Sequence, residues 1–314
     1  MKTALLFSGQ GSQYVGMIKD IIESYPEAKV QVEKANEILG FDLCKISIEG
    51  PANVLKETRY TQPALFLHSS LIVNILGKKI DFSAVAGHSV GEYAALYASG
   101  VLSFEDALRL VALRGELMFN AGEAEKGTMF AVINLDDKKV EEVCAELTDA
   151  SQRLFVVPAN FNSPGQIVVS GSAEHMRNNI DKFKDAGARM VKELVVSGAF
   201  HSPLMEPAKK ELEKAILNIE FKNAKVPVYV NVTGEPVTHA KELKKVLIEQ
   251  LTSPVLWTQT MINMKNDGFI KYTEVGPGNV LQGLVKRTLN EVEIGGIDKA
   301  EDIEIILRYA LDTK

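Results

Sequence analysis

The segment Gly87-His88-Ser89-Val90-Gly91 constrains the fold of this chain more than any other feature. An apolar run containing Val85 precedes it, and a helix-like segment at 92–96 follows it. A strand-to-helix turn tight enough to expose a serine hydroxyl leaves no room for a Cβ atom at its flanks, which explains the two glycines. The pattern predicts a nucleophile elbow with Ser89 at its tip. A helix N-terminus there would stabilise a developing oxyanion.

The composition is that of an ordinary globular protein, with 314 residues of which 46% are hydrophobic. The chain has no run of 18 apolar residues, and its amino-terminal apolar stretch is too short for a signal peptide, so we expect a soluble, cytoplasmic protein. Cys44 and Cys144 lack disulfide or metal-ligand spacing, so we expect reduced thiols and no metal site. A net charge of −6 disfavours binding to nucleic acid or to an anionic membrane surface.

Strand-length apolar segments alternate with segments of helical period along most of the chain. Strands are predicted at 4–7, 82–86, 226–230 and 270–275, and helices from about 14, at 63–76 and at 203–217. This alternation is typical of an α/β fold with a parallel sheet.

The middle of the chain follows a different order. Strands are predicted at 128–133, 154–159, 167–170 and 188–194, with helices at 136–147 and 173–185. The order β-α-β-β-α-β is that of a ferredoxin-like unit. We therefore assign 125–196 to an inserted subdomain, and 1–124 together with 197–314 to the core domain.

An activated serine needs a base, and the chain has five histidines. Four are less suitable: two lie at polar helix starts, one lies in an apolar helix and one is directed away from the serine (His175, His239, His68 and His88). His201 remains, at a predicted strand-to-helix junction where α/β proteins place ligand-facing residues. A role in capping a helix is the alternative. No carboxylate is well placed to orient the imidazole, so the minimum hypothesis is a dyad of Ser89 and His201.

Arg114 lies on the apolar face of the helix predicted at 104–119. Burial of an unpaired guanidinium is unfavourable, so Arg114 needs an anion. That anion is either a protein carboxylate or a ligand. If it is a ligand, the substrate carries a carboxylate.

Four motifs, in order along nearly the whole chain, resemble those of malonyl-CoA:acyl carrier protein transacylases, which belong to the acyltransferase family of fatty acid and polyketide synthesis. The motifs occupy 9–13, 87–92, 198–202 and 274–278. The resemblance implies an α/β-hydrolase-like core interrupted by a ferredoxin-like insert. It also implies that Ser89 is the nucleophile, that His201 is the base and that Arg114 binds the malonyl carboxylate.

The same resemblance implies roles for further residues. The backbone N–H groups of Gln10 and Val90 would form the oxyanion hole, and the backbone carbonyl of Gln250 would orient the histidine. Asn160 and Asn162 match asparagines beside the active site. Phe200 resembles the bulky residue that precedes the histidine in malonyl-selective members, and it would crowd a 2-methyl branch.

The activity implied is ping-pong malonyl transfer from malonyl-CoA to the phosphopantetheine thiol of acyl carrier protein, by a monomer without metal or bound cofactor. A serine hydrolase or acyl-thioesterase using the same dyad is an alternative, as are a trans-acting polyketide acyltransferase and a non-catalytic docking module. Carrier proteins are acidic, so basic residues near the site are candidates for docking. These are Lys286, Arg287, Arg189 and Lys192.

Overall fold

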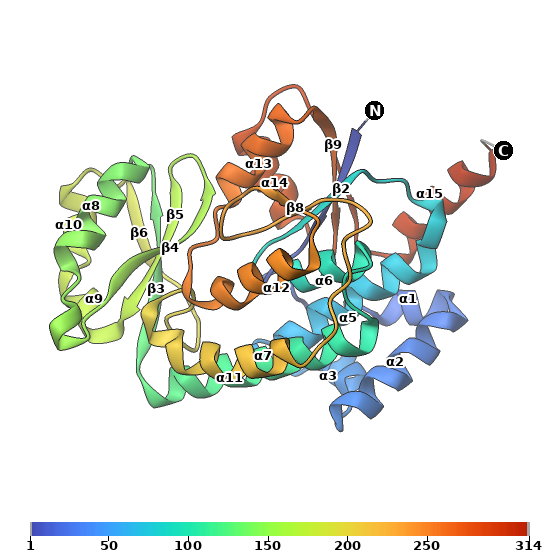
Figure 1. Cartoon of the computed structure of the whole chain (residues 1–314), viewed down its shortest axis with the longest axis horizontal. Coiled ribbons are helices and arrows are strands. Elements are labelled where there is room, and N and C mark those ends of the chain that lie inside the picture. Colours follow the sequence, from blue (N-terminus) through green and yellow to red (C-terminus); the bar gives the residue numbers. More distant parts are fainter. Residues whose placement is uncertain (1, 313–314) are drawn as a thin grey trace.

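The computed structural model describes residues 2–312, and its larger β-sheet has six strands in the order β10-β9-β1-β2-β7-β8 (Figure 1). Neighbouring strands pair in parallel, except that β8 is antiparallel to β7. This sheet confirms the predicted α/β fold class. Its strands are β1 (Lys2–Phe7), β2 (Ala84–Gly87), β7 (Val228–Tyr229), β8 (Pro236–Val237), β9 (Phe269–Val275) and β10 (Glu293–Ile297).

Three central strands, β1, β2 and β9, end at the same level of this sheet. Phe7 at the end of β1 pairs with Gly87 on one side and with Val275 on the other. The loops that follow carry three of the four sequence motifs, among them the segments 9–13 and 276–278. Ligands bind at the carboxyl ends of strands in open parallel sheets, so this edge is the expected location of a functional site.

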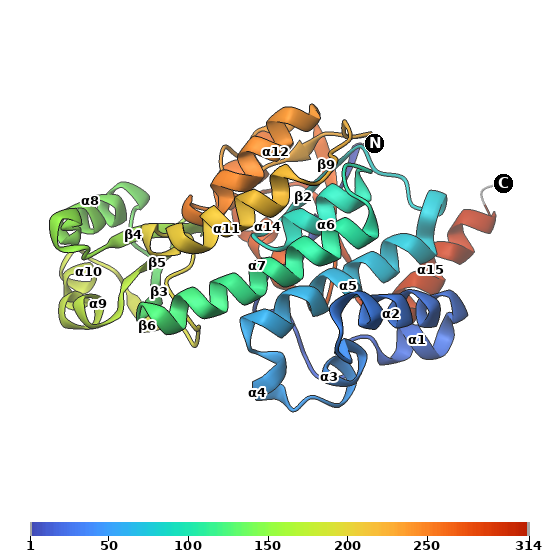
Figure 2. The ribbon, with the colours of Figure 1, turned by 60° about the horizontal axis from the view of Figure 1, so that its bottom comes forward.

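Helices cover both faces of the large sheet (Figures 1 and 2). Side chains of β1 alternate between two apolar cores, with Leu5 and Phe7 in the larger core and Ala4 and Leu6 in the smaller one. The larger core includes α5 and α7, which lie side by side, and the smaller one includes α13 and α14. The helices of this part are α1 (Lys19–Ser24), α2 (Pro26–Leu39), α3 (Leu43–Glu49), α4 (Ala52–Leu55), α5 (Thr58–Leu76), α6 (Gly91–Ala98), α7 (Phe104–Ala124), α11 (Glu206–Leu217), α12 (Ala240–Glu249), α13 (Trp257–Asn266), α14 (Val280–Thr288) and α15 (Ala300–Asp312), with short 3-10 helices η1 (Gly77–Lys79), η3 (Pro203–Met205) and η4 (Gln250–Thr252).

A second, antiparallel sheet has the strand order β4-β5-β3-β6. Its elements follow the predicted β-α-β-β-α-β order within the segment 125–196. Phe130 and Val132 pack on one face against the helices of this unit, whereas Met129 joins the core of the larger unit. The elements are β3 (Gly127–Ile133), α8 (Asp137–Leu147), η2 (Ala150–Gln152), β4 (Val156–Ser163), β5 (Gln166–Ser172), α9 (Ala173–Asn179), α10 (Asp181–Asp185) and β6 (Met190–Glu193).

The two connections between the sheets pack backbone against backbone. Gly122 lies near the end of α7, and a Cβ atom there would stand 1.8 Å from the carbonyl oxygen of Ser197. A Cβ atom at Gly127 would stand 2.6 Å from the backbone nitrogen of Ala199. Only glycine permits this approach, so these two contacts fix how the small sheet sits against the large one.

Several element boundaries differ from the sequence predictions, among them those of α5, α1 and β7. Helix α5 begins at Thr58 and contains Pro63, whereas the sequence analysis placed the start of this helix at Pro63. The chain at 15–18 forms turns, and the first helix begins at Lys19. Strand β7 has only two residues, because the chain turns back into β8 after two pairs with β2.

Cys44 and Cys144 are free thiols. Every helix within residues 2–312 is too short or too polar to cross a bilayer. Nor does this part of the chain bring together three His, Cys, Asp or Glu side chains in a group able to hold a metal ion.

Candidate active site

Ser89 stands at the tip of the turn between β2 and α6. Its backbone has a φ angle of +53°, a strained value for a residue with a side chain. A Cβ atom at Gly87 would stand 2.0 Å from the Gly91 carbonyl carbon, and one at Gly91 would stand 2.2 Å from the Phe7 oxygen. The turn therefore packs against β1 as well as against itself. This is the steric reason for the glycine spacing that the sequence analysis used.

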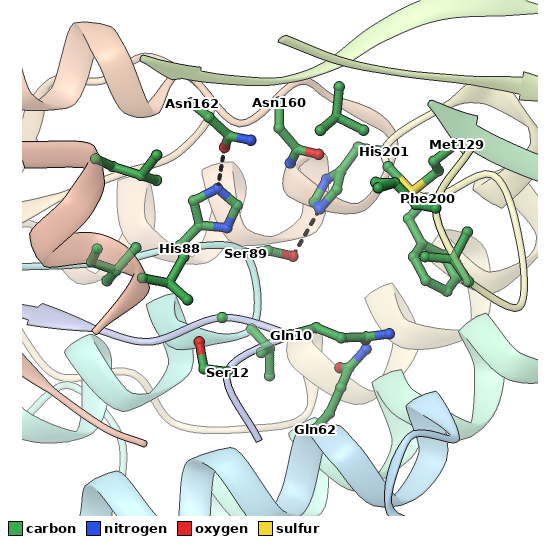
Figure 3. Close-up of a pocket in the computed structure, with 18 of the residues that line it drawn as sticks. Gln10, Ser12, Gln62, His88, Ser89, Met129, Asn160, Asn162, Phe200 and His201 are labelled. Carbon is green, nitrogen blue, oxygen red and sulfur yellow. Dashed lines mark hydrogen bonds between the residues drawn. The ribbon is translucent and has the colours of Figure 1, made fainter. Parts of the chain in front are cut away.

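The structure brings Ser89 and His201 together from positions 112 residues apart, with 2.8 Å between Ser89 Oγ and His201 Nε2 (Figure 3). His201 Nδ1 lies 3.0 Å from the backbone oxygen of Gln250 and 3.1 Å from that of Ser253. Carbonyl oxygens only accept hydrogen bonds, so Nδ1 carries the proton and Nε2 is free to accept from the serine hydroxyl. Two carbonyls thus occupy the place of the missing third carboxylate.

His201 is held in its neutral form. Its side chain is buried, and burial followed by the nearby Arg114 charge lowers its pKa to about 3. Desolvation and a neighbouring cation both disfavour an imidazolium. The geometry and the protonation state therefore agree with a base that is ready to accept a proton.

Arg114 on α7 is only 1% exposed and reaches the same serine. Its guanidinium donates hydrogen bonds to Gln62 Oε1 at 2.7 Å, to Gln250 Oε1 at 3.0 Å and to Ser89 Oγ at 3.0 Å. Its charge also lies 5.7 Å from the ring centroid of Tyr93. No Asp or Glu within residues 2–312 forms an ion pair with Arg114.

The charge of Arg114 is therefore held by neutral groups. Burial lowers the pKa of its guanidinium, but guanidinium remains protonated in proteins. Of the two alternatives for a buried arginine, a structural ion pair and a ligand site, the structure favours the ligand site.

A cavity of about 220 Å³ between the two sheets is lined by Ser89, His201 and Arg114. Figure 3 shows Ser89 and His201 in its wall. One side is apolar, with Phe200 beside Met129 (Figure 3). All of the predicted site residues except Gln250 line this cavity, and Gln250 lies directly behind Ser89 and Arg114. The remaining lining comprises Gly9, Ser12, Gln62, His88, Met118, Met129, Gln166, Val168, Leu194, Val196, Val280, Leu281 and Leu284.

The predicted oxyanion donors lie at the carboxyl ends of the parallel strands, where the functional site is expected. Gln10 follows β1, and Val90 immediately follows Ser89. Neither backbone N–H donates a hydrogen bond within the described part of the chain. The Gln10 side chain, in contrast, is fixed by a 3.1 Å hydrogen bond to Thr58 Oγ1. The two N–H groups are thus free for a ligand oxygen.

Three site residues escaped the sequence analysis. His88 lines the cavity, and its Nε2 is directed to Asn162 Oδ1, at 2.8 Å, and not to the serine (Figure 3). Gln62 holds Arg114, and Asn231 accepts the backbone N–H of Ser89 at 2.7 Å. The position of Asn231 just after a parallel strand was the one available signal.

The four predicted docking residues are all exposed. Arg287 on α14 donates a 2.6 Å hydrogen bond to Gln166, which lines the cavity. Lys286 adjoins it on the same helix, and Arg189 and Lys192 lie on the small sheet and its leading loop. Arg287 at least stands at the rim of the site.

A serine on a strand-to-helix elbow, a neutral buried histidine and free backbone N–H groups define an enzyme that transfers acyl groups through an acyl-serine. The chain belongs to the acyl transferase domain family, whose sequence pattern matches residues 4–313. This match confirms the family resemblance drawn from the four motifs.

Several relatives match over nearly their full length. The chain is 39% identical over 295 residues to the malonyl CoA-acyl carrier protein transacylase of Haemophilus influenzae, covering 93% of this chain and 94% of the relative. A crystal structure of an acyl carrier protein S-malonyltransferase from Vibrio cholerae superposes with a TM-score of 0.92, at 39% identity, and covers 98% of this chain and all of the other (100%). A second structure, described as a type II PKS acyl-carrier protein in complex with its malonyl-transacylase, also gives a TM-score of 0.92, at 37% identity, with 98% and 100% coverage.

Proposed function

We propose that this protein transfers a malonyl group from malonyl-CoA to the phosphopantetheine thiol of acyl carrier protein through a malonyl ester of Ser89. One observation carries the proposal: the Arg114 guanidinium lies 3.0 Å from the Ser89 hydroxyl, and no Asp or Glu in the described part of the chain forms an ion pair with it. An acyl group that bears its own carboxylate supplies the missing anion, and a bidentate contact would orient it. The names of the relatives support the same substrates.

The first half-reaction loads the enzyme. Ser89 gives its hydroxyl proton to His201 Nε2 as its oxygen attacks the thioester carbonyl. The backbone N–H groups of Gln10 and Val90 stabilise the tetrahedral oxyanion. The carbon–sulfur bond then breaks, and the coenzyme A thiolate leaves with the proton that His201 returns.

The second half-reaction reverses these roles with a new thiol. His201 takes the proton of the phosphopantetheine thiol, whose sulfur attacks the malonyl ester, and Ser89 leaves and recovers its proton. Both half-reactions need only the nucleophile, the base, the N–H groups and the arginine, so the proposed cycle uses no bound cofactor. The cavity is complete in one chain, which supports action as a monomer.

Selectivity among acyl groups follows from the two ends of the cavity. An acyl group without a carboxylate leaves a buried cation unpaired, which is a strong penalty. A methyl branch meets Phe200 instead, and shape discrimination against a methyl group is worth only about 1–3 kcal/mol. We therefore propose strict selection for a carboxylate and mild selection against a branch.

The test is intact mass measurement after incubation with malonyl-CoA, with and without holo-acyl carrier protein. We expect a malonyl adduct on the enzyme that Ser89→Ala abolishes, and transfer of that adduct to the carrier. The carrier is supplied from both a fatty acid and a polyketide system, since the chemistry at Ser89 is the same for both. Release of free malonate in place of carrier acylation would assign the protein to the hydrolases, and the absence of any adduct would leave only a docking role.

A further inference from the structure

Asn231 brackets the nucleophile elbow from a strand far along the chain. It lies two residues after the end of β7 and is fully buried. Its Oδ1 accepts the backbone N–H of Ser89 at 2.7 Å, and its Nδ2 donates to the backbone oxygen of Gly87 at 2.7 Å. One side-chain amide thus satisfies a backbone group on each side of His88. The bond to Gly87 is buried and the bond to Ser89 is partly buried, so a lost partner at either is costly.

The elbow needs such support because Ser89 is held at a φ angle of +53°. Residues with a Cβ atom persist in this region only where their surroundings impose it. The glycine contacts impose it sterically, and the Asn231 amide adds two directed hydrogen bonds. A shift of the Ser89 backbone would move its Oγ away from His201, which lies 2.8 Å away.

Glu92 in turn holds Asn231. Its side chain is 1% exposed, and its Oε2 accepts the backbone N–H of Asn231 at 2.6 Å. Glu92 lies in the first turn of α6, the helix that follows Ser89. The hydrogen bonds therefore form a closed circuit that ties the start of α6 to the end of β7. Burial raises the pKa of Glu92 to about 7, and the hydrogen bond from Asn231 opposes this shift.

The bond to Asn231 also decides which N–H groups stabilise the oxyanion. The Ser89 N–H is engaged by Asn231, whereas those of Gln10 and Val90 donate to no group within residues 2–312. The oxyanion hole therefore excludes the nucleophile's own N–H. If the bond to Asn231 were lost, the Ser89 N–H would become a further donor, and it would compete with Gln10 and Val90 for the oxyanion from a different direction.

We propose that Asn231 is a positioning residue for the nucleophile and that Glu92 positions Asn231. Neither residue lines the cavity, so each acts through Ser89 and not through contact with the substrate. The inference rests on Ser89 as the nucleophile of the proposed function. It does not depend on malonyl as the acyl group.

The experiment compares Asn231→Ala, Asn231→Asp, Glu92→Ala and Glu92→Gln with the unmodified chain. Two rates are measured: acylation of Ser89 by malonyl-CoA in a single turnover, and labelling of Ser89 by phenylmethanesulfonyl fluoride. The sulfonyl reagent carries no carboxylate, so it reports on Ser89 even if malonyl-CoA is not the substrate. We expect Asn231→Ala to slow both rates about 100-fold, with little change in KM for malonyl-CoA.

The conservative variants separate positioning from folding. Glu92→Gln keeps an acceptor oxygen for the Asn231 N–H, so it should be about tenfold faster than Glu92→Ala in both assays. Asn231→Asp keeps the acceptor for Ser89 but loses the donor to Gly87, and we expect about a tenfold loss. Unchanged labelling in folded Asn231→Ala would overturn the proposal. If that variant does not fold, unchanged labelling in Asn231→Asp would overturn it equally.

Discussion

Gln250 joins the arginine to the base: its side-chain oxygen accepts a hydrogen bond from Arg114 at 3.0 Å, and its backbone oxygen lies 3.0 Å from His201 Nδ1. Its side-chain nitrogen also donates to the backbone oxygen of Ser89 at 3.0 Å. One residue thus contacts the nucleophile, the base and the arginine. Because its amide is neutral, Gln250 fixes the guanidinium without cancelling the charge.

Replacing Gln250 by Glu should convert this neutral contact into a buried ion pair. The new carboxylate would compete with the acyl carboxylate for Arg114 and repel it, so we expect kcat/KM for malonyl-CoA to fall about 100-fold, with a smaller loss for acetyl-CoA. The backbone carbonyl that orients His201 is unchanged. Gln250→Met is the matched control, since it removes the contact without adding charge; an equal loss in both variants would contradict the charge argument.

Removal of the Arg114 guanidinium should have different effects on the two acyl donors malonyl-CoA and acetyl-CoA. We expect Arg114→Ala to lower kcat/KM for malonyl-CoA at least about 100-fold, while the value for acetyl-CoA is kept or improved, because no buried cation is then left unpaired. Steady-state kinetics with both donors measures the effect. An equal loss for both would show that Arg114 only supports the fold around Ser89.

The rate of Ser89 acylation should not fall in the pH range where an ordinary histidine becomes protonated. With the His201 pKa lowered to about 3, the base is neutral throughout the range of assay, so the rate should stay level from about pH 5 to 8. A fall in rate would begin only as the pH approaches the pKa from above. The rate of Ser89 labelling by phenylmethanesulfonyl fluoride, which needs no carboxylate, measures this profile.

The pH profile of Arg114→Ala tests how far the charge of Arg114 lowers the pKa of His201. Arg114 is the second cause of the lowered pKa, after burial, so its removal should raise the pKa and shift the acid limb to higher pH. An acid limb at the same pH in both proteins would contradict this cause.

The contact between Gly122 and Ser197 should not tolerate a methyl group. Gly122→Ala would place a Cβ atom 1.8 Å from a backbone oxygen, so we expect the free energy of unfolding to fall by about 1–3 kcal/mol or more. Gly283→Ala in α14 is the control. Its Cβ would meet open space, and the change should be neutral or stabilise by about 0.4–1 kcal/mol. Chemical denaturation of both variants measures the difference.

Charge reversal at the cavity rim should weaken carrier binding. We expect Lys286→Glu combined with Arg287→Glu to raise KM for acyl carrier protein about tenfold and to reduce its salt dependence, with smaller effects from reversal at Arg189 and Lys192. Lys78→Glu combined with Lys79→Glu, on the 3-10 helix η1 that precedes β2, controls for the same change in net charge. If the KM for acyl carrier protein is unchanged by the substitutions and by salt concentration, these residues are not part of the carrier interface.

Features encoded locally were predictable from the sequence. The elbow follows from the steric demands at Gly87 and Gly91, and the burial of Arg114 follows from helical periodicity. Apart from the meeting of Ser89 with His201 and the roles that the family resemblance implied, contacts made across the chain were not predictable. Asn231 meets Ser89 across 142 residues, and the side chain of Gln250 meets Arg114 across 136. No local pattern indicates which polar side chain will arrive at a given edge of a sheet.

The small size of the cavity has a consequence for what the enzyme distinguishes. A space of about 220 Å³ holds a short acyl group and its thioester, and nothing as large as a nucleotide or a folded domain. A carrier protein must therefore stay outside the cavity and bring its acyl group or thiol to Ser89 on the phosphopantetheine arm. Coenzyme A and acyl carrier protein would thus use the same entrance in turn. Contacts that distinguish the two would lie on the protein surface around this entrance.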